Sequence, residues 1–239
     1  MEETSARLRD STEDYAILFA RNPVPGQVKS RLRTHLTPEQ ACRLHCASTN
    51  DVMTLLAQAL PRANKFLFLS EEPAVDLAEC GLLLPAGFRL AVQEGNDLGE
   101  RMEGAFRRAF ACGARRVVIF GSDSPTLRPE IVRNAFCRLC DCDLTLGPTD
   151  DGGYYLIGCR RFQERLFHEV EWSTPRTFEQ TLANAARLGL RVAVLERWFD
   201  LDEWEDVERV LSIARRGEPL PSHLAAFLKE LGTIGNQSG

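Results

Sequence analysis

Short, continuous apolar runs recur along the chain and alternate with segments whose apolar residues follow a helical spacing. Continuous runs are typical of strands buried on both faces of a sheet, and alternation with helices is typical of parallel sheets. The predicted strands are 15–20, 65–69, 90–93, 116–121, 143–147, 154–158 and 191–195. The predicted helical segments are 29–35, 38–60, 98–113, 128–139, 175–188, 203–215 and 221–231. This pattern predicts an α/β fold, with a three-layer α/β/α sandwich around a mostly parallel sheet.

One domain is expected. The chain has no internal repeat, no low-complexity segment and no linker rich in Pro, Gly or Ser. Its 239 residues, 44% of them hydrophobic, are enough for one large α/β domain. We expect a domain over 14–231, an N-terminal tail over 1–13 and a flexible C-terminal tail over 232–239. Nothing in the sequence sets the oligomeric state.

Charge and hydropathy limit the partners. The formal net charge is −5, which argues against nucleic acid because duplex binding usually needs a basic surface. A small phosphorylated ligand needs only a local basic pocket. No apolar run approaches the ~20 residues that cross a bilayer, and the first twelve residues lack the apolar core of a signal peptide. We therefore expect a cytoplasmic protein without a membrane span.

Eight cysteines raise the question of a zinc site. Three of them, Cys137, Cys140 and Cys142, lie close together. A structural zinc site usually takes a second pair of ligands at regular spacing, and the sequence offers none. The cluster is therefore predicted to be structural.

The loop after the first predicted strand is the first candidate site. Open α/β sheets bind ligands at the carboxyl ends of their strands. Gly26 lets the backbone approach a phosphate, and Lys29 and Arg31 supply positive charge. The spacing of Gly26 and Lys29 excludes a Walker A loop. The alternative is an ordinary surface loop with scattered basic residues.

Acidic residues follow two later strands. Asp123 comes after the most apolar strand, 116–121, where a carboxylate suits Mg²⁺ or Mn²⁺; alternatively it organises a turn before Pro125. Asp200 and Asp202 share one face if their segment is extended. Asp202 also fits a capping box with Glu205, a role compatible with metal binding.

Two glycine-containing segments complete the candidates. In the segment 93–102, Gly95 and Gly99 permit close backbone approach, Arg101 can reach a phosphate, and Asp97 is a predicted helix cap. The turn 150–153 either offers backbone amides to an acceptor substrate or is a plain hairpin turn.

The segment 172–175 opens a predicted helix. Thr174 is expected to cap that helix and Pro175 to be its first residue. The same segment could form a wall of the substrate site.

Taken in order, the segments 19–32, 97–102, 121–125, 151–155 and 200–202 resemble an uncharacterised bacterial family of glycosyltransferase A-type (GT-A), nucleotide-diphospho-sugar-transferase-like proteins. The resemblance implies a GT-A fold, as in molybdenum-cofactor guanylyltransferase and phospholactate guanylyltransferase. Arg21 and Ser30 stand where the family often has Lys and Thr, and 202–206 lacks the Pro of the family's late motif.

The motifs and the resemblance together nominate the site residues. The catalytic residues would be Lys29 and Asp123. The divalent metal would be held by Asp123 and Asp202, with Asp200 as the substitute. Nucleotide phosphates would be bound by Arg21, Pro25, Gly26, Lys29, Arg31, Gly95, Asp97 and Arg101. The acceptor would be bound by Asp151, Gly152, Gly153, Ser173 and Thr174.

The function expected on these grounds is that of a Mg²⁺- or Mn²⁺-dependent transferase with a small-molecule acceptor. The leading expectation is a GT-A-type glycosyltransferase that uses a nucleotide sugar. The alternative is a nucleotidyltransferase that moves a nucleotide from a nucleoside triphosphate to a small phosphorylated or carboxylated acceptor. A further alternative is a non-catalytic nucleotide-binding domain.

Overall fold

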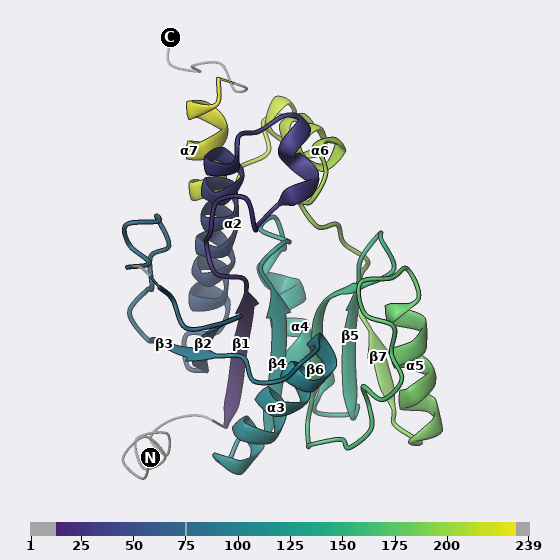
Figure 1. Ribbon diagram of the computed structural model, residues 1–239. Coiled ribbons are helices and arrows are strands. Elements are labelled where there is room, and N and C mark those ends of the chain that lie inside the picture. Colours follow the sequence, from purple (N-terminus) through teal and green to yellow (C-terminus); the bar gives the residue numbers. More distant parts are fainter. Residues whose placement is uncertain (1–12, 75, 233–239) are drawn as a thin grey trace.

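The computed structural model describes residues 13–74 and 76–232. Within them, seven strands form one sheet in the order β3-β2-β1-β4-β6-β5-β7 (Figure 1). Only β6 runs antiparallel to its neighbours in this described sheet. The strands are β1 (Asp14–Ala20), β2 (Asn64–Leu69), β3 (Phe88–Val92), β4 (Arg116–Gly121), β5 (Leu144–Pro148), β6 (Tyr154–Cys159) and β7 (Val192–Val194). The predicted α/β fold with a mostly parallel sheet is confirmed.

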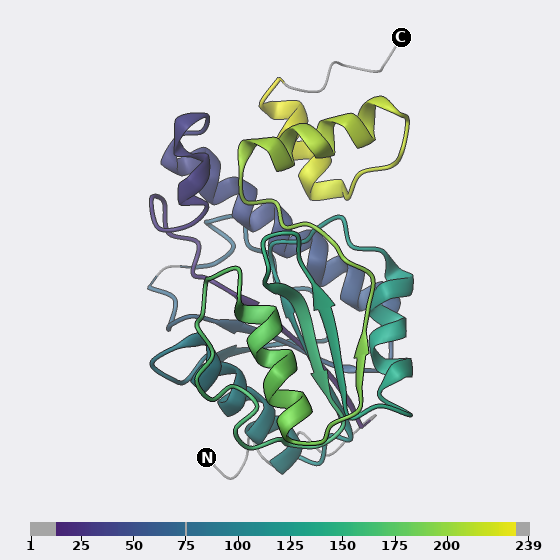
Figure 2. The same cartoon turned by 90° about the vertical axis from the view of Figure 1, so that its right-hand side faces the viewer.

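Helices cover both faces of the sheet (Figures 1 and 2). One face carries α2 and α4, and the other carries α3 and α5. A short 3₁₀ helix, η2, and the last two helices, α6 and α7, pack together against the start of α2. The bounds are η2 (Ser30–Thr34), α2 (Pro38–Ala59), α3 (Leu98–Ala111), α4 (Pro129–Arg138), α5 (Thr177–Arg187), α6 (Trp204–Arg215) and α7 (Ser222–Glu230).

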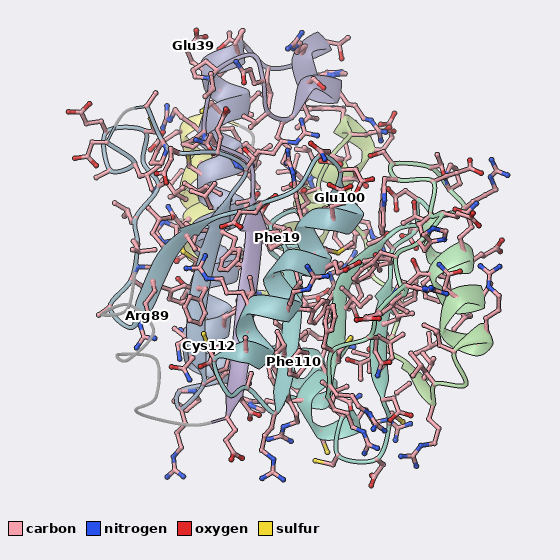
Figure 3. The ribbon with its side chains drawn as sticks, turned by 60° about the horizontal axis from the view of Figure 1, so that its bottom comes forward. Phe19, Glu39, Arg89, Glu100, Phe110 and Cys112 are labelled. Atoms are coloured by element: carbon pink, nitrogen blue, oxygen red, sulfur yellow. The ribbon has the colours of Figure 1, made fainter. Side chains whose placement is uncertain are left out.

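The central strand β1 contributes to two cores because its side chains alternate between the faces. Leu18 packs with Met53 of α2 on one side. Phe19 lies on the other side with Phe106 of α3, and Figure 3 shows α3 running from Glu100 to Phe110 across this face. A strand buried on both faces reads as a continuous apolar run, which is why β1 was recognisable from the sequence.

A third apolar cluster lies beyond the carboxyl ends of the strands. Leu32 of η2 and Leu201, just before α6, are both fully buried in it. His35 stacks on Trp204, with ring centroids 4.4 Å apart. The loop after β1 is therefore packed firmly against the segment that leads into α6, although more than 160 residues separate them in sequence.

The predicted helix starts were partly right. Thr37 and Gln40 form a capping box at the start of α2. Asp97 caps α3, accepting a hydrogen bond from the backbone N–H of Glu100 at 2.8 Å. The Glu100 carboxylate, however, accepts from the backbone N–H of Asn96 rather than from that of the cap residue.

Two predicted caps were wrong. The helix α5 begins at Thr177 rather than after Thr174, because the Thr174 carbonyl accepts from the Thr177 N–H in a preceding turn. The cap of α6 is Glu203, not Asp202, and its capping-box partner is Asp206. The helix thus starts one residue later than the sequence pattern indicated.

Further predictions concern the tails, the single domain, membrane spans and the cysteines. The predicted tails, 1–13 and 232–239, lie almost entirely outside the described residues, and the single domain over 14–231 stays a prediction. Among the described helices, none is both long enough and apolar enough to span a membrane. All eight cysteines are free thiols, and Cys137 and Cys140 are exposed.

Candidate active site

Three chain segments meet at the carboxyl edge of the sheet. The neighbouring strands β1 and β4 are parallel, with Phe19 opposite Gly121, so the loops that follow them emerge side by side. The backbone N–H of Leu201 donates to the carbonyl of Asp123 at 2.7 Å. This bond holds the segment before α6 against the end of β4.

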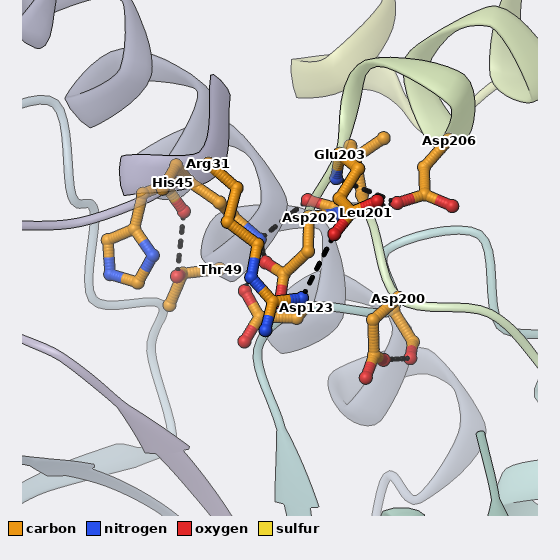
Figure 4. Close-up of polar contacts among 11 residues, drawn as sticks. Arg31, His45, Thr49, Asp123, Asp200, Leu201, Asp202, Glu203 and Asp206 are labelled. Atoms are coloured by element: carbon orange, nitrogen blue, oxygen red, sulfur yellow. Dashed lines mark hydrogen bonds and ion pairs between the residues drawn. The ribbon is translucent and has the colours of Figure 1, made fainter. Parts of the chain in front are cut away.

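Lys29 lies at the centre of this junction. Its ammonium donates to the Asp123 carboxylate, to the Leu201 carbonyl at 2.8 Å and to the Asp202 carboxylate at 2.9 Å. The Lys29 side chain is only 2% exposed, whereas those of Asp123 and Asp202 are each 40% exposed. Figure 4 shows the two aspartates close to one another, with the residues around Glu203 beside them. The structure thus brings together three residues that the sequence nominated.

The charges in this cluster stabilise one another. Burial alone would lower the pKa of the Lys29 ammonium, but Asp123 and Asp202 outweigh it and raise that pKa above its ordinary value. Partial burial works against ionisation of Asp123, but the Lys29 ammonium outweighs it and holds the pKa of that carboxyl below its ordinary value. Lys29 and Asp123 are therefore both charged near neutral pH.

Asp200 has a different environment. Its carboxylate accepts a hydrogen bond from the Ser124 hydroxyl at 2.6 Å, to one side of the Asp123–Asp202 pair (Figure 4). Burial first, and the negative charge of Asp123 second, raise the pKa of Asp200 to about 7. Asp202, rather than Asp200, shares Lys29 with Asp123.

The chemistry of the carboxylate pair fits a divalent cation. Asp123 and Asp202 each use one oxygen, Oδ1, for Lys29. Their partial exposure leaves the second oxygen of each available, and carboxylate oxygens are preferred ligands of Mg²⁺ and Mn²⁺. Within the described part of the chain, no three His, Cys, Asp or Glu side chains are grouped to hold a metal ion by themselves. Mg²⁺ commonly takes one or two carboxylates and completes its shell with substrate oxygens and water.

Arg21 is the free cation of the first loop. Its side chain is exposed, and its guanidinium makes no hydrogen bond or ion pair among the described residues; its positive charge contributes to the low pKa of Asp123. Its carbonyl accepts a hydrogen bond from Nε2 of buried His45 at 2.9 Å. Because burial lowers the pKa of His45, the ring is neutral with its proton on Nε2.

The rest of the first loop is less available to phosphate. Arg31 pairs with Glu203 at 3.2 Å. Gly26 has a φ of 81°, which favours glycine, and its carbonyl accepts from the Arg33 guanidinium. Pro25 is exposed. A phosphate role for these residues remains a proposal.

Packing and local hydrogen bonds explain why Gly95 and Arg101 occur in the segment before α3. A side chain on Gly95 would place Cβ 2.7 Å from the backbone N of Arg101, and Arg101 itself donates to the Gly95 carbonyl at 3.1 Å. Gly95 and Asp97 also line a cavity of about 760 Å³. Six carboxylates and two arginines line it, so the cavity disfavours anionic phosphate.

The predicted acceptor turn lies at the same edge, because β6 begins opposite the end of β4. One Asp151 oxygen accepts from the Thr149 hydroxyl at 2.5 Å and from the Gly153 N–H at 3.0 Å. A Cβ on Gly152 would lie 2.2 Å from the Pro175 carbonyl oxygen. Close packing against the segment before α5 therefore explains this glycine without a substrate.

Ser173 has a φ of 59° and is exposed, while Thr174 is half-buried and hydrogen-bonded to the Glu171 carbonyl. Three further groups at this edge of the sheet were not nominated from the sequence. These are the Leu201 carbonyl, His45 and Arg209, which stacks on Phe199 and pairs with Asp150 at 2.9 Å. Only His45, a polar residue on the apolar face of α2, left a signal that could have been followed.

Comparison with known proteins gives this geometry a context. Residues 54–174 match the family described as uncharacterized proteins conserved in bacteria, DUF2064. The phosphoenolpyruvate guanylyltransferase of Rubrobacter xylanophilus is 32% identical over 186 residues, which cover 76% of this chain and 86% of that protein.

Two solved structures extend the comparison. A candidate nucleotide-diphospho-sugar transferase from Desulfovibrio desulfuricans G20 superposes with a TM-score of 0.81 and 31% identity, over 93% of this chain and 96% of that one. Rv0371c of Mycobacterium tuberculosis in complex with manganese has a TM-score of 0.50 and 19% identity, over 84% and 99% of the two chains, which shows a shared fold. The chain thus belongs to the DUF2064 family and is a transferase with the fold of the nucleotide-diphospho-sugar transferases.

Proposed function

We propose that this protein is a nucleotidyltransferase, which moves a nucleotide from a nucleoside triphosphate to a small phosphorylated or carboxylated acceptor. The observation that carries the proposal is the convergence of Asp123 and Asp202 at the carboxyl edge of the sheet, beside the free guanidinium of Arg21. The similarity to a guanylyltransferase supports nucleotidyl transfer over the glycosyl transfer that the sequence alone favoured.

The reaction needs positioning and charge neutralisation more than covalent help from the protein. An acceptor oxygen forms a bond to the α-phosphorus, the bond from that phosphorus to the β-bridging oxygen breaks, and pyrophosphate leaves. The Arg21 guanidinium donates no hydrogen bond to another group in the described chain. Its five N–H groups are therefore available to the triphosphate. The hydrogen bond from His45 to the Arg21 carbonyl holds the backbone of Arg21 in place.

A Mg²⁺ or Mn²⁺ ion is the cofactor of this proposal. Asp123 and Asp202 would hold it through their outer oxygens, and it would neutralise charge on the phosphate oxygens when bound. Without such an ion, the two carboxylates would repel the triphosphate that Arg21 attracts.

The acceptor is proposed to lie by the turn before β6 and the exposed Ser173, where the sequence placed it. Phosphoenolpyruvate, the substrate named for the Rubrobacter relative, belongs to the class of phosphorylated carboxylates that we propose here. Arg197, which donates to the Thr149 carbonyl at 2.5 Å, brings positive charge to this side of the edge.

Pyrophosphate release tests the proposal. Each of the four nucleoside triphosphates is supplied with Mg²⁺ or Mn²⁺ and with phosphoenolpyruvate or other phosphorylated carboxylates, and the product is identified by mass. We expect release that requires one triphosphate and one acceptor together, and that Asp123→Asn abolishes. Release without an acceptor-linked product would contradict transfer.

Glycosyl transfer is the second candidate, because the Desulfovibrio structure carries a sugar-transferase description. It predicts that nucleotide sugars, rather than triphosphates, are consumed with release of a nucleoside diphosphate. If ligands only raise the melting temperature and neither reaction occurs, the non-catalytic binding domain becomes the better description.

A further inference from the structure

Lys29 has no hydrogen left to offer a substrate. An ammonium group carries three donor hydrogens, and Lys29 directs them to three protein oxygens, on Asp123, Leu201 and Asp202. Its side chain is 2% exposed. The residue lies beneath the two carboxylates rather than in the solvent where a triphosphate would approach.

The backbone holds this inward arrangement. Lys29 has a φ of 49° and a ψ of 42°, the left-handed conformation that residues with a Cβ rarely adopt. Leu32, one turn later, is fully buried in the cluster with Leu201. Moving the ammonium outward to reach phosphate would break three hydrogen bonds and leave two carboxylates and a buried carbonyl without their donor.

The charge of the cluster is incomplete. Asp123 and Asp202 bring two negative charges, and Lys29 brings one positive charge. Each carboxylate engages Lys29 through Oδ1, which leaves Oδ2 without a contact to Lys29, and each side chain is 40% exposed. The pair therefore keeps one net negative charge on its outer side.

We propose that Lys29 is the internal counter-ion of the Asp123–Asp202 pair, and that it shares these carboxylates with a divalent cation instead of binding nucleotide phosphate. Lys29 neutralises the inner oxygens and joins the first loop to the end of β4 and the segment before α6. The outer oxygens are left for the cation. This inference rests on the proposed function for the identity of that cation.

The proposal predicts that a divalent cation can replace the lysine charge. In Lys29→Met the two carboxylates lose their shared partner, so the melting temperature in EDTA should fall below that of the wild type. Addition of Mn²⁺ without nucleotide should raise the melting temperature of Lys29→Met by several degrees more than that of the wild type. Because a neighbouring positive charge is removed, Mn²⁺ measured by its electron paramagnetic resonance signal should bind Lys29→Met about tenfold more tightly.

Lys65 offers a matched control. It is also a buried lysine, 6% exposed, but its ammonium donates to two backbone carbonyls, of Leu60 and Ala63, at 2.8 Å each. Lys65→Met should lose stability in EDTA and gain no more from Mn²⁺ than the wild type. In Lys29→Met/Asp202→Asn the charge is rebalanced, so stability in EDTA should recover and the extra response to Mn²⁺ should disappear.

Three outcomes would overturn the proposal. They are a Lys29→Met response to Mn²⁺ no larger than that of Lys65→Met, a Mn²⁺ affinity equal to or weaker than the wild-type affinity, and a Lys29→Met chain that stays unfolded with Mn²⁺ as well as with EDTA. None of these measurements uses a nucleotide. Enhanced Mn²⁺ binding without any turnover of triphosphates would therefore refute the proposed reaction and leave the counter-ion role intact.

Discussion

Asp51, in the middle of α2, caps the start of α7 from outside that helix: its carboxylate accepts hydrogen bonds from the backbone N–H of Leu224 at 2.7 Å and of His223 at 3.0 Å. The residue at the N-cap position of α7, Pro221, makes no side-chain cap. A buried carboxylate on one helix thus supplies the acceptors that the first turn of another requires.

Asp51→Ala should therefore destabilise the protein. Hydrogen bonds to a charged group are worth about 1.5–3 kcal/mol each when one partner is removed, and the two here share one carboxylate, so we expect a loss of about 3 kcal/mol. Urea unfolding followed by circular dichroism measures it. Asp51→Asn keeps one acceptor oxygen and should lose about half as much. Equal stability of Asp51→Ala and the wild type would show that α7 docks through its apolar face alone.

Arg21→Ala should weaken the binding of nucleoside triphosphate more than Arg31→Ala does. Arg21 has no protein partner among the described residues, whereas Arg31 is paired with Glu203. Loss of a charge-assisted hydrogen bond corresponds to a rise in Kd of about 10- to 100-fold, measured by calorimetry with Mg²⁺ present. A larger effect of Arg31→Ala would indicate that phosphate binds at the later part of the loop, where Lys29 and Arg31 were predicted to bind it.

Most of the fold could be predicted from the sequence because β1 and β4 are buried on both faces and read as unbroken apolar runs. The capping box of Thr37 was equally visible, since it is local in sequence. The start of α6 was misjudged by one residue because Asp202 and Glu203 both fit a cap, and only the contact with Lys29 decides between them.

The candidate site was harder to predict. Asp123 and Asp202 could be nominated from their positions after strands and before helices. The inward orientation of Lys29 could not be predicted, because it depends on a left-handed backbone and on the Leu201 carbonyl, 172 residues away. Side-chain chemistry indicated which residues matter, whereas tertiary packing decided which of them remain free for a ligand.

Asp200 should make the stability of the protein depend on pH. Its pKa in the folded state is about 7, above the ordinary value of 3.8. Between these values the folded state keeps a proton that the unfolded chain has released, so the free energy of unfolding falls as pH rises from about 4 to 7. In Asp200→Asn, which still accepts from Ser124, this fall should be smaller by on the order of 2–4 kcal/mol.

Urea unfolding at pH 4.5 and pH 8, in EDTA, compares the two proteins. The wild type should approach the variant in stability at the lower pH and fall behind it at the higher pH. If the difference in stability between the two proteins is the same at both pH values, Asp200 ionises normally in the folded state, and burial and the charge of Asp123 do not raise its pKa.

Asp202→Asn should reduce turnover and Glu203→Ala should reduce stability, because these neighbouring residues have different roles in the structure. Glu203 caps α6 and pairs with Arg31, so Glu203→Ala should cost about 1 kcal/mol of stability and retain turnover. Asp202 uses its carboxylate for Lys29, and only its backbone N–H contacts the cap, at Asp206. Asp202→Asn should therefore leave α6 intact and reduce metal-dependent turnover about 100-fold or more.

Far-UV circular dichroism and pyrophosphate release separate the two effects. Full turnover in Asp202→Asn, with the Asp123→Asn variant inactive, would mean that Asp123 alone supplies the protein's carboxylate to the cation.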